Sequence, residues 1–129
     1  MKKRFLFLLF SIFALGSLKA QLPDGSQAPD WILTDLNGNT HHLQEYLDAG
    51  KTVYIDMFAT WCGPCWNYHQ THTLKNLYEQ YGPDGTDQVM VFGIESDIST
   101  PTNCLYDQNC PSSQGDWTAG VPYPIIDIT

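Results

Sequence analysis

The chain has 129 residues, a net charge of −8 and four cysteines. Nucleic acids and anionic membranes repel so acidic a chain, which argues against both as partners, whereas basic patches on another protein would attract it. The length fits one domain with a single hydrophobic core, and an aromatic content of 13% argues against disorder.

The first twenty residues have the layout of a secretory signal peptide. Basic residues precede a mainly apolar run, Phe5 to Leu15, and the small residue Ala20 marks a cleavage site. The run is shorter than the ~20 residues of a membrane-spanning helix, and an uncleaved anchor is the alternative. Cleavage would leave residues 21–129 as the domain, with two lysines against fourteen acidic residues and a net charge of −12. We therefore expect an exported protein, periplasmic or extracellular, without stable membrane contact.

The domain begins with signals for a hairpin and a short helix. Two extended runs, Trp31–Thr34 and Thr40–Leu43, flank Asn37-Gly38-Asn39, which predicts a β-hairpin. A short helix is expected over Leu43–Ala49, with Gly50 at its end.

A strand, a helix and a second strand follow. Thr52–Ala59 is apolar on both alternating faces except at Asp56, which predicts a strand in the middle of a sheet covered on both sides. Leucines and tyrosines at helical spacing predict a helix that ends near Tyr81, before the turn Gly82–Gly85. Val89–Ile94 has the pattern of a second buried strand, so the unit is a crossover between parallel strands.

The remaining chain is a long irregular stretch and a short strand. Ser96–Gly120 lacks periodicity, and its length is typical of a functional loop or an insertion. Ile125–Ile128 is predicted to be a strand, and it lies at the end of the sequence, where an edge strand is a poor place to finish a domain. We therefore expect the sequence to be a fragment of a longer protein.

The candidate site is Trp61-Cys62-Gly63-Pro64-Cys65, directly after the first buried strand and at the beginning of a helix. The first helical turn offers free N–H groups and the positive end of the helix dipole, which would stabilise a thiolate at Cys62. Both sulfurs lie on one turn, and Pro64 fits there because its missing N–H costs nothing. The pattern indicates thiol–disulfide exchange, in which Cys62 attacks a substrate disulfide and Cys65 resolves the mixed disulfide.

Other interpretations of the cysteine pair are open. Half of a zinc site would need a second ligand pair, and the five residues between Cys104 and Cys110 are not the usual zinc spacing. Covalent haem attachment would need a histidine directly after the second cysteine, where Trp66 stands. A purely structural disulfide is a further possibility, although a disulfide that closes so short a loop is an unlikely structural cross-link. We expect no cofactor and no metal.

Five stretches of the chain resemble the thioredoxin superfamily and, within it, the exported TlpA/ResA-like thiol-disulfide oxidoreductases. The stretches are Ala28–Trp31, Thr34–Gly38, Val53–Thr60, Trp61–Cys65 and the run from Gly120 to Pro124. The resemblance implies an α/β thioredoxin-like fold with a central mixed sheet flanked by helices. The sequence stops after the strand that follows the family's cis-proline, so the last strand and helix of the family have no counterpart.

The resemblance also assigns roles to residues of the motif. Cys62 matches the attacking cysteine and Cys65 the resolving one, and Trp61, Gly63 and Pro64 support the motif. The implied partners are protein thiols and disulfides, together with an unidentified electron donor. Gly-Pro between the cysteines resembles the reducing members, whose potentials lie near ~−270 mV against ~−120 mV for strong oxidants, so we favour a reductase.

Two further roles follow from the same resemblance. Pro124 best matches the cis-proline beside the cysteines, with Pro122 as its rival, and it would expose the backbone of Tyr123 to a substrate chain. Asp56 stands where thioredoxins carry a buried acid. Burial would raise the pKa of its carboxyl group and let it take the proton of the resolving thiol. An aspartate satisfied by local hydrogen bonds is the alternative.

Cys104 and Cys110 lie outside the pattern of the family. We expect a structural disulfide that closes a short loop and contributes about 2 kcal/mol, with a second redox pair as the alternative.

Two other functions compete with the reductase. The Ala28-Pro29-Asp30 lead-in suggests a peroxiredoxin-like peroxidase, and a non-catalytic thioredoxin-like module of a secreted protein would bind a partner or a metal such as copper.

Overall fold

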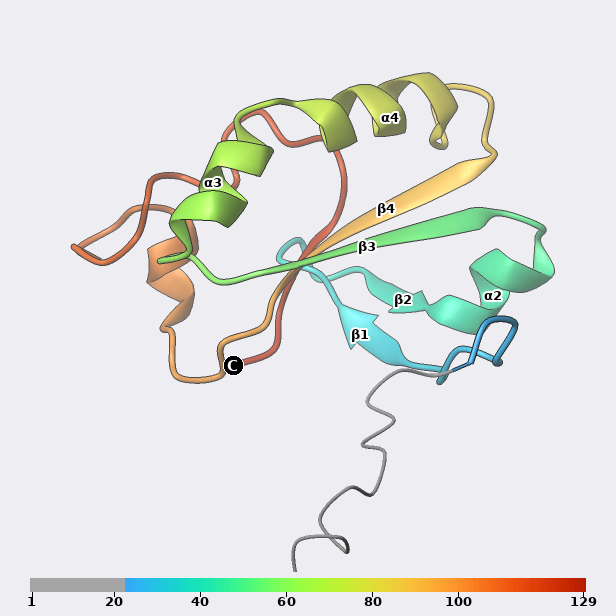
Figure 1. Cartoon of the computed structure of the whole chain (residues 1–129), viewed down its shortest axis with the longest axis horizontal. Coiled ribbons are helices and arrows are strands. Elements are labelled where there is room, and N and C mark those ends of the chain that lie inside the picture. Colours follow the sequence, from blue (N-terminus) through green and yellow to red (C-terminus); the bar gives the residue numbers. More distant parts are fainter. Residues whose placement is uncertain (1–22) are drawn as a thin grey trace, which may run out of the picture.

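The computed structural model describes residues 23–129, so the expected signal segment lies outside the described residues. The described chain contains two small sheets, three α-helices and one 3₁₀ helix. In chain order they are β1 (Ile32–Thr34), β2 (Thr40–His42), α2 (Leu43–Asp48), β3 (Thr52–Phe58), α3 (Gly63–His69), α4 (Thr73–Tyr81), β4 (Val89–Glu95), η2 (Thr102–Leu105) and β5 (Ile125–Asp127). Figure 1 shows α3 and α4 on one side of β3 and β4, with the β1–β2 hairpin and α2 on the other.

The main sheet has three parallel strands in the order β3-β4-β5. β3 and β4 pair along their whole lengths, from Thr52 opposite Val89 to Phe58 opposite Glu95. Two helices connect these parallel strands, so the predicted crossover is confirmed. β5 pairs with the second half of β4, and the isolated antiparallel bridge between Asp35 and Ile126 joins the hairpin to this sheet.

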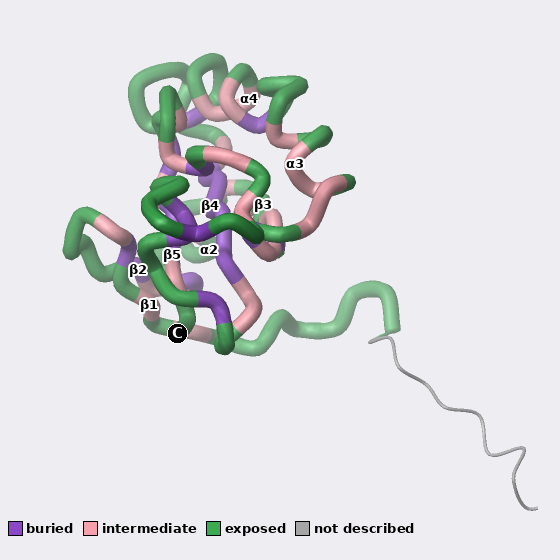
Figure 2. Tube along the Cα trace, turned by 90° about the vertical axis from the view of Figure 1, so that its left-hand side faces the viewer, coloured by how far each residue is buried: buried purple, intermediate pink, exposed green. Residues whose placement is uncertain are grey.

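β4 is the buried centre of the sheet, as predicted for Val89–Ile94. Every residue from Met90 to Glu95 is buried, and Figure 2 shows this strand as the main buried track through the molecule. Alternate residues of β4 enter two hydrophobic clusters, one on each face. β4 therefore lies between the two hydrophobic clusters and contributes side chains to both.

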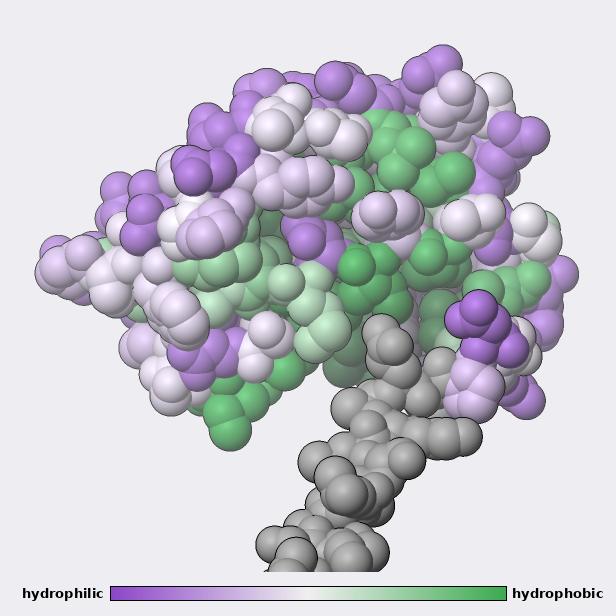
Figure 3. Space-filling model, viewed as in Figure 1, coloured by the Kyte–Doolittle hydropathy of each residue, from purple (hydrophilic) through white to green (hydrophobic). Residues whose placement is uncertain are grey.

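The prediction that Thr52–Ala59 lies in the middle of a sheet is wrong for the described chain. β3 pairs only with β4, and its other edge has no strand partner among residues 23–129. Tyr54, Ile55 and Met57 consequently expose 47%, 38% and 64% of their surface. Figure 3 shows hydrophobic side chains in the middle of the face that β3 crosses. Apolar alternation predicts that side chains favour burial, but it does not say which element covers them.

The N-terminal elements match their predictions. β1 and β2 form an antiparallel hairpin around the turn at Gly38, and α2 follows directly. Asp35 holds the turn, because its carboxylate accepts hydrogen bonds from the backbone N–H groups of Asn37 and Asn39, each at 2.9 Å, and lies 3.0 Å from Nε2 of His41. Burial alone would raise the pKa of Asp35, but the hydrogen bonds from His41 and Asn39 outweigh it and hold the pKa below its usual value.

The helical region after the motif consists of two helices. α3 ends at His69, and α4 begins after His72, whose φ of 56° lies in the left-handed region. Leu74, one of the leucines at helical spacing, is buried against the sheet. α4 ends at Tyr81, and the turn that begins at Gly82 follows as predicted.

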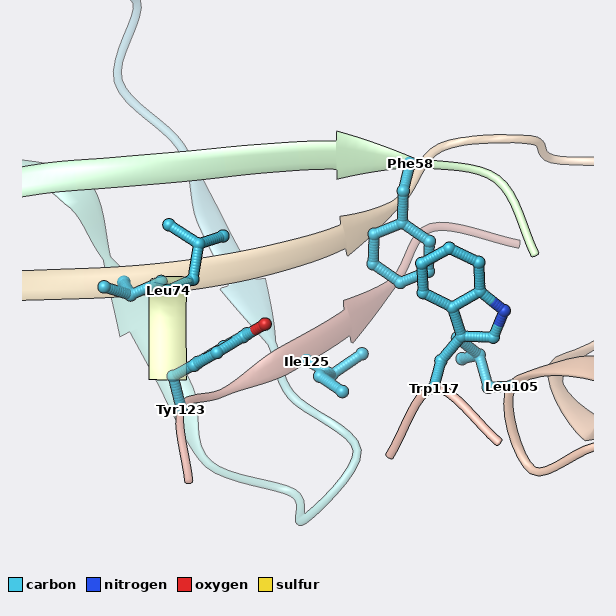
Figure 4. Close-up of a cluster of buried hydrophobic side chains, with 7 residues drawn as sticks. Phe58, Leu74, Leu105, Trp117, Tyr123 and Ile125 are labelled. Carbon is cyan, nitrogen blue, oxygen red and sulfur yellow. The ribbon is translucent and has the colours of Figure 1, made fainter. Parts of the chain in front are cut away.

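The stretch 96–120 is irregular apart from η2, and it folds against the carboxyl ends of β3 and β4. Cys104 and Cys110 form a disulfide with a Cα–Cα distance of 5.1 Å. Leu105 and Trp117 from this stretch are completely or almost completely buried. Figure 4 shows both side chains beside Phe58, so the loop forms part of the core on the helix side of the sheet.

On the opposite face, Phe92 connects the hairpin to the sheet. Its ring is fully buried and makes edge-to-face contacts with Trp31, His41 and Tyr46, at centroid distances of 5.2, 5.1 and 5.5 Å. These contacts join β4 to β2, to α2 and to the chain that enters β1. The hairpin therefore depends on this ring for its position.

We predict that Phe92→Ala lowers the free energy of unfolding by about 3–5 kcal/mol, because it removes the ring and leaves a cavity. Urea unfolding followed by circular dichroism measures the change. Ile98→Ala, at a side chain that is 75% exposed, is the control and should stay within about 0.5 kcal/mol of the wild type. A cost for Phe92→Ala no larger than that of the control would contradict the role of the ring.

Candidate active site

Cys62 lies at the N-cap of α3. β3 ends at Phe58, a short loop follows, and Cys62 has extended dihedral angles, φ −77° and ψ 103°, before the helix begins at Gly63. The backbone N–H of Cys65 points to Sγ of Cys62 at a distance of 3.3 Å. Pro64 occupies the first turn, where no N–H is needed. The sulfur at position 62 therefore takes the place of a capping oxygen at the helix N-terminus.

Cys62 and Cys65 form a disulfide with a Cα–Cα distance of 5.3 Å. Both residues are half-buried, and Cys65 packs against the hydrophobic cluster on the helix side of the sheet. The two sulfurs thus lie between the core and the surface.

Trp61, directly before Cys62, lies at the surface. Its ring is 53% exposed, and its indole N–H donates to Oδ2 of Asp97 at 2.7 Å. The hydroxyl of Ser99 and the indole N–H of Trp61 donate to the Asp97 carboxylate and lower its pKa to about 2. A permanent negative charge therefore lies beside the residue that precedes Cys62.

Asp56 lies on β3, opposite Gly93 of β4. It is two positions before Phe58, and alternate residues of a strand face the same side, so both side chains face the helix side of the sheet. Burial raises the pKa of Asp56. Its charge also contributes to the raised pKa values of Tyr68 and Tyr123, both of which are raised mainly by burial, that of Tyr123 to about 12. The carboxyl group is thus half-buried on the helix side of the sheet, where its charge acts on Tyr68 and Tyr123.

The prediction that the peptide bond before Pro124 is cis is wrong. No peptide bond among residues 23–129 is cis, so the bonds before Pro122 and Pro124 are trans. The carbonyl of Pro124 accepts a hydrogen bond from the N–H of Gly93, on the edge of β4 opposite to β3. Tyr123 is buried in the core rather than presented to a substrate. An uninterrupted strand after a proline is no evidence for the cis isomer, because trans X–Pro bonds also lead into strands.

Two buried polar residues near the motif, Thr60 and Glu95, were not predicted from the sequence. Thr60 is fully buried two residues before Cys62, and Glu95, at the end of β4, exposes 1% of its surface. Thr60 Oγ1, Glu95 Oε2 and Asp127 Oδ2 are buried without a hydrogen-bond partner. Burial raises the pKa of Glu95. A charged residue directly after a buried apolar run was the available signal for Glu95.

The histidines do not gather around the sulfurs. His69 stacks on Trp66 with a centroid distance of 5.2 Å, and burial lowers the pKa of His69. His41 and His42 contact Asp35 and Asp30 respectively, at the hairpin. Among residues 23–129, no group of three or more His, Cys, Asp or Glu side chains could hold a metal ion. Nor does any helix in that part of the chain have the length and apolar character needed to cross a membrane.

Comparison with known proteins places the chain in a family. The model of the family described as Redoxin matches residues 23–125. The chain belongs to the Redoxin family. Its curated relatives include the thiol-disulfide oxidoreductase ResA of Geobacillus kaustophilus, which is 37% identical over 73 residues, and that of Bacillus subtilis, which is 33% identical over 111 residues. The chain is a TlpA/ResA-like member of the thioredoxin superfamily.

These matches cover only part of each relative. The aligned region is 57% of this chain and 40% of the Geobacillus protein, and 76% of this chain and 60% of the Bacillus subtilis protein. The thioredoxin domain of a thiol-disulfide oxidoreductase from Bacteroides vulgatus superposes with a TM-score of 0.57 at 19% identity, covering 84% of this chain and 66% of that one. This likeness shows the thioredoxin-like α/β fold.

We predict that Asp56→Asn stabilises the protein at pH 7 but not at pH 3. A carboxyl group whose pKa is raised in the folded state lowers stability as the pH rises above its unfolded pKa, because its ionisation is opposed by burial. Asparagine has no such ionisation. Urea midpoints of the two proteins should therefore differ at pH 7 and converge at pH 3.

The control for this prediction is Asp24→Asn, at an exposed residue, which should leave both midpoints unchanged. A destabilised Asp56→Asn protein at pH 7 would show that the Asp56 carboxylate is held by favourable interactions instead.

Proposed function

We propose that this protein is a thiol-disulfide oxidoreductase that acts on protein disulfides through Cys62 and Cys65, in the direction of reduction. One observation carries the proposal: Sγ of Cys62 faces the N–H of Cys65 at the beginning of α3, and the two cysteines are joined in a disulfide. The family and the ResA relatives support the same chemistry.

The helix N-terminus explains why Cys62 is the nucleophile. In the dithiol form, the N–H of Cys65 and the dipoles of the first turn of α3 stabilise negative charge on Sγ of Cys62. Thiolates stabilised in this way form near neutral pH, and the thiolate is the reactive species. Cys65 contacts the hydrophobic cluster and has no such cap, so it is suited to act second.

The reaction proceeds in two exchanges. The thiolate of Cys62 attacks one sulfur of the substrate disulfide, a Cys62–substrate disulfide forms, and the other substrate sulfur leaves as a thiolate and is protonated. Cys65 then loses its proton and attacks Sγ of Cys62, so the Cys62–Cys65 disulfide forms and the second substrate thiol is released. Two electrons pass from the cysteine pair to the substrate, and a dithiol donor returns the pair to its reduced state.

Asp56 is proposed as the acceptor of the Cys65 proton. Its side chain faces the layer between β3 and α3, and burial raises its pKa towards the range in which a carboxylate exchanges protons with a thiol. A carboxylate with an ordinary pKa would be a weaker base.

The setting of the reaction is proposed to be the periplasm or the extracellular space. Residues 1–20 have the pattern of a signal peptide, and the domain carries two disulfides, which persist in oxidising compartments. The acidic surface favours protein substrates over nucleic acids and anionic membranes.

Cysteine variants test the function. Cys62→Ser should reduce the turnover of a cystine peptide to the uncatalysed rate, because the attacking sulfur is lost. Cys65→Ser should instead accumulate a covalent mixed disulfide with the peptide, because the resolving step is blocked. Mass spectrometry detects this species under non-reducing conditions. Full turnover by Cys62→Ser, or peroxide consumption without peptide reduction by the wild type, would contradict the proposal.

Asp56→Asn tests the proton acceptor. It should slow release of the mixed disulfide by about 100-fold, in the range of general-base effects, while its formation by Cys62 stays nearly unchanged. Single-turnover kinetics measure the two steps separately. An equal slowing of both steps would indicate a structural role for Asp56.

A further inference from the structure

The irregular stretch 96–120 folds back over the residues that lead into Cys62. The carbonyl of Thr60 accepts two hydrogen bonds from it, from the backbone N–H of Gln114 at 3.0 Å and from the indole N–H of Trp117 at 3.2 Å. The carbonyl of Trp61 accepts a third, from Nε2 of Gln114 at 3.2 Å. Both carbonyls immediately before Cys62 are thus held by residues more than 50 positions away in the chain.

We propose that this stretch is a clamp that sets the geometry of the Cys62 cap, with Gln114 and Trp117 as positioning residues and the Cys104–Cys110 disulfide as the anchor of the clamp. The inference rests on the proposed function of the Cys62–Cys65 pair and adds a second disulfide that tunes the first. Both residues hydrogen-bond to the backbone before Cys62. Each acts through the backbone before Cys62.

Trp117 connects both sides of the motif. Its ring exposes 1% of its surface and stacks on Phe58, the last residue of β3, at a centroid distance of 4.4 Å. It also meets Trp66 of α3 edge to face at 4.9 Å. Figure 4 shows the ring of Trp117 against that of Phe58. One side chain therefore contacts the strand that precedes Cys62 and the helix that follows it.

The backbone of the clamp also lies close to α3. At Gly115, which has a φ of 157°, an added Cβ would come within 2.6 Å of the Trp66 ring. Only a residue without a side chain allows this approach. Gly115 therefore brings Gln114 and Trp117 to the distance at which they reach the two carbonyls.

The second disulfide fixes this part of the loop. Cys104 and Cys110 are both buried, and Oγ of Ser113 donates to the carbonyl of Cys104 at 2.9 Å and lies 3.0 Å from the carbonyl of Gly115. The backbone N–H of Trp117 donates to the carbonyl of Leu105 at 2.8 Å. The two donors to the Thr60 carbonyl are thus tied to the short loop that the disulfide closes.

The expected consequence concerns the reduced form of the active pair. Loosening the chain before Cys62 allows its sulfur to move from the N–H of Cys65, so the thiolate loses stabilisation. The dithiol form then becomes less stable relative to the disulfide, and the pair becomes more reducing. The clamp therefore makes the pair less reducing than the same motif would be without it.

The test measures the Cys62–Cys65 equilibrium with glutathione in the full chain. Gln114→Ala and Trp117→Phe each remove one side-chain donor, and Cys104→Ser with Cys110→Ser removes the anchor. Each should shift the equilibrium about three- to tenfold towards the disulfide, which corresponds to roughly 14–30 mV. The pH midpoint of Cys62 alkylation should rise in parallel.

Trp31→Phe is the matched control, because it makes the same ring change on the opposite face of the sheet. It should shift neither the glutathione equilibrium nor the alkylation midpoint.

Unchanged equilibria and alkylation midpoints in Gln114→Ala and Trp117→Phe, equal to those of Trp31→Phe, would overturn the clamp. Gln114 is exposed, so its variant tests the inference even where Trp117→Phe or the double cysteine variant fails to fold. The equilibrium of the pair is measured without a protein substrate. A wild-type chain that equilibrates with glutathione but reduces no protein disulfide would therefore contradict the proposed function, whereas unchanged variants would contradict only the clamp.

Discussion

The site depends on one short contact, between the N–H of Cys65 and Sγ of Cys62. It exists because β3 ends at Phe58 and α3 begins at Gly63, which leaves Cys62 at the only position where its side chain can cap the helix. One residue earlier, the sulfur would lie in the loop, and one later it would lie on the side of the helix. The ends of these two elements therefore place the sulfur at position 62 where the proposed nucleophile needs it.

The two faces of β4 have different roles. On the face towards the hairpin, Phe92 and the hydrogen-bonded Asp35 hold structural elements together. On the face towards the helices, Asp56, Cys65 and Trp117 lie in or beside one apolar layer. Burial raises the pKa of Asp56, whereas the pKa of Asp35 is lowered because hydrogen-bond donors surround its carboxylate and outweigh its burial. The same residue type thus holds a turn on one face, and on the other it is the group that we propose as the proton acceptor.

Local features of this chain could be predicted from sequence, and long-range ones could not. The hairpin at Asn37–Asn39, the parallel crossover and the position of Cys62 follow from turn residues, periodicity and spacing within short windows. The open edge of β3 was missed because alternation does not identify the covering element. The cis isomer at Pro124 was wrongly predicted because strand continuity does not distinguish trans from cis. The hydrogen bond from Trp117 to the Thr60 carbonyl joins residues 57 positions apart, and no local pattern encodes such a contact.

Two electrostatic influences act on a thiolate at Cys62 in opposite directions. The permanently charged Asp97 lies beside Trp61 and opposes a negative sulfur, whereas the N–H groups of α3 favour it. The carboxylate of Asp97 is hydrogen-bonded to Ser99 and Trp61 and is open to solvent, so water and salt weaken its field over about 8–10 Å. The N–H of Cys65 acts at 3.3 Å in a half-buried site, where screening is weaker. In the proposed mechanism, the balance therefore favours the thiolate of the reduced pair as long as the backbone before Cys62 keeps its position.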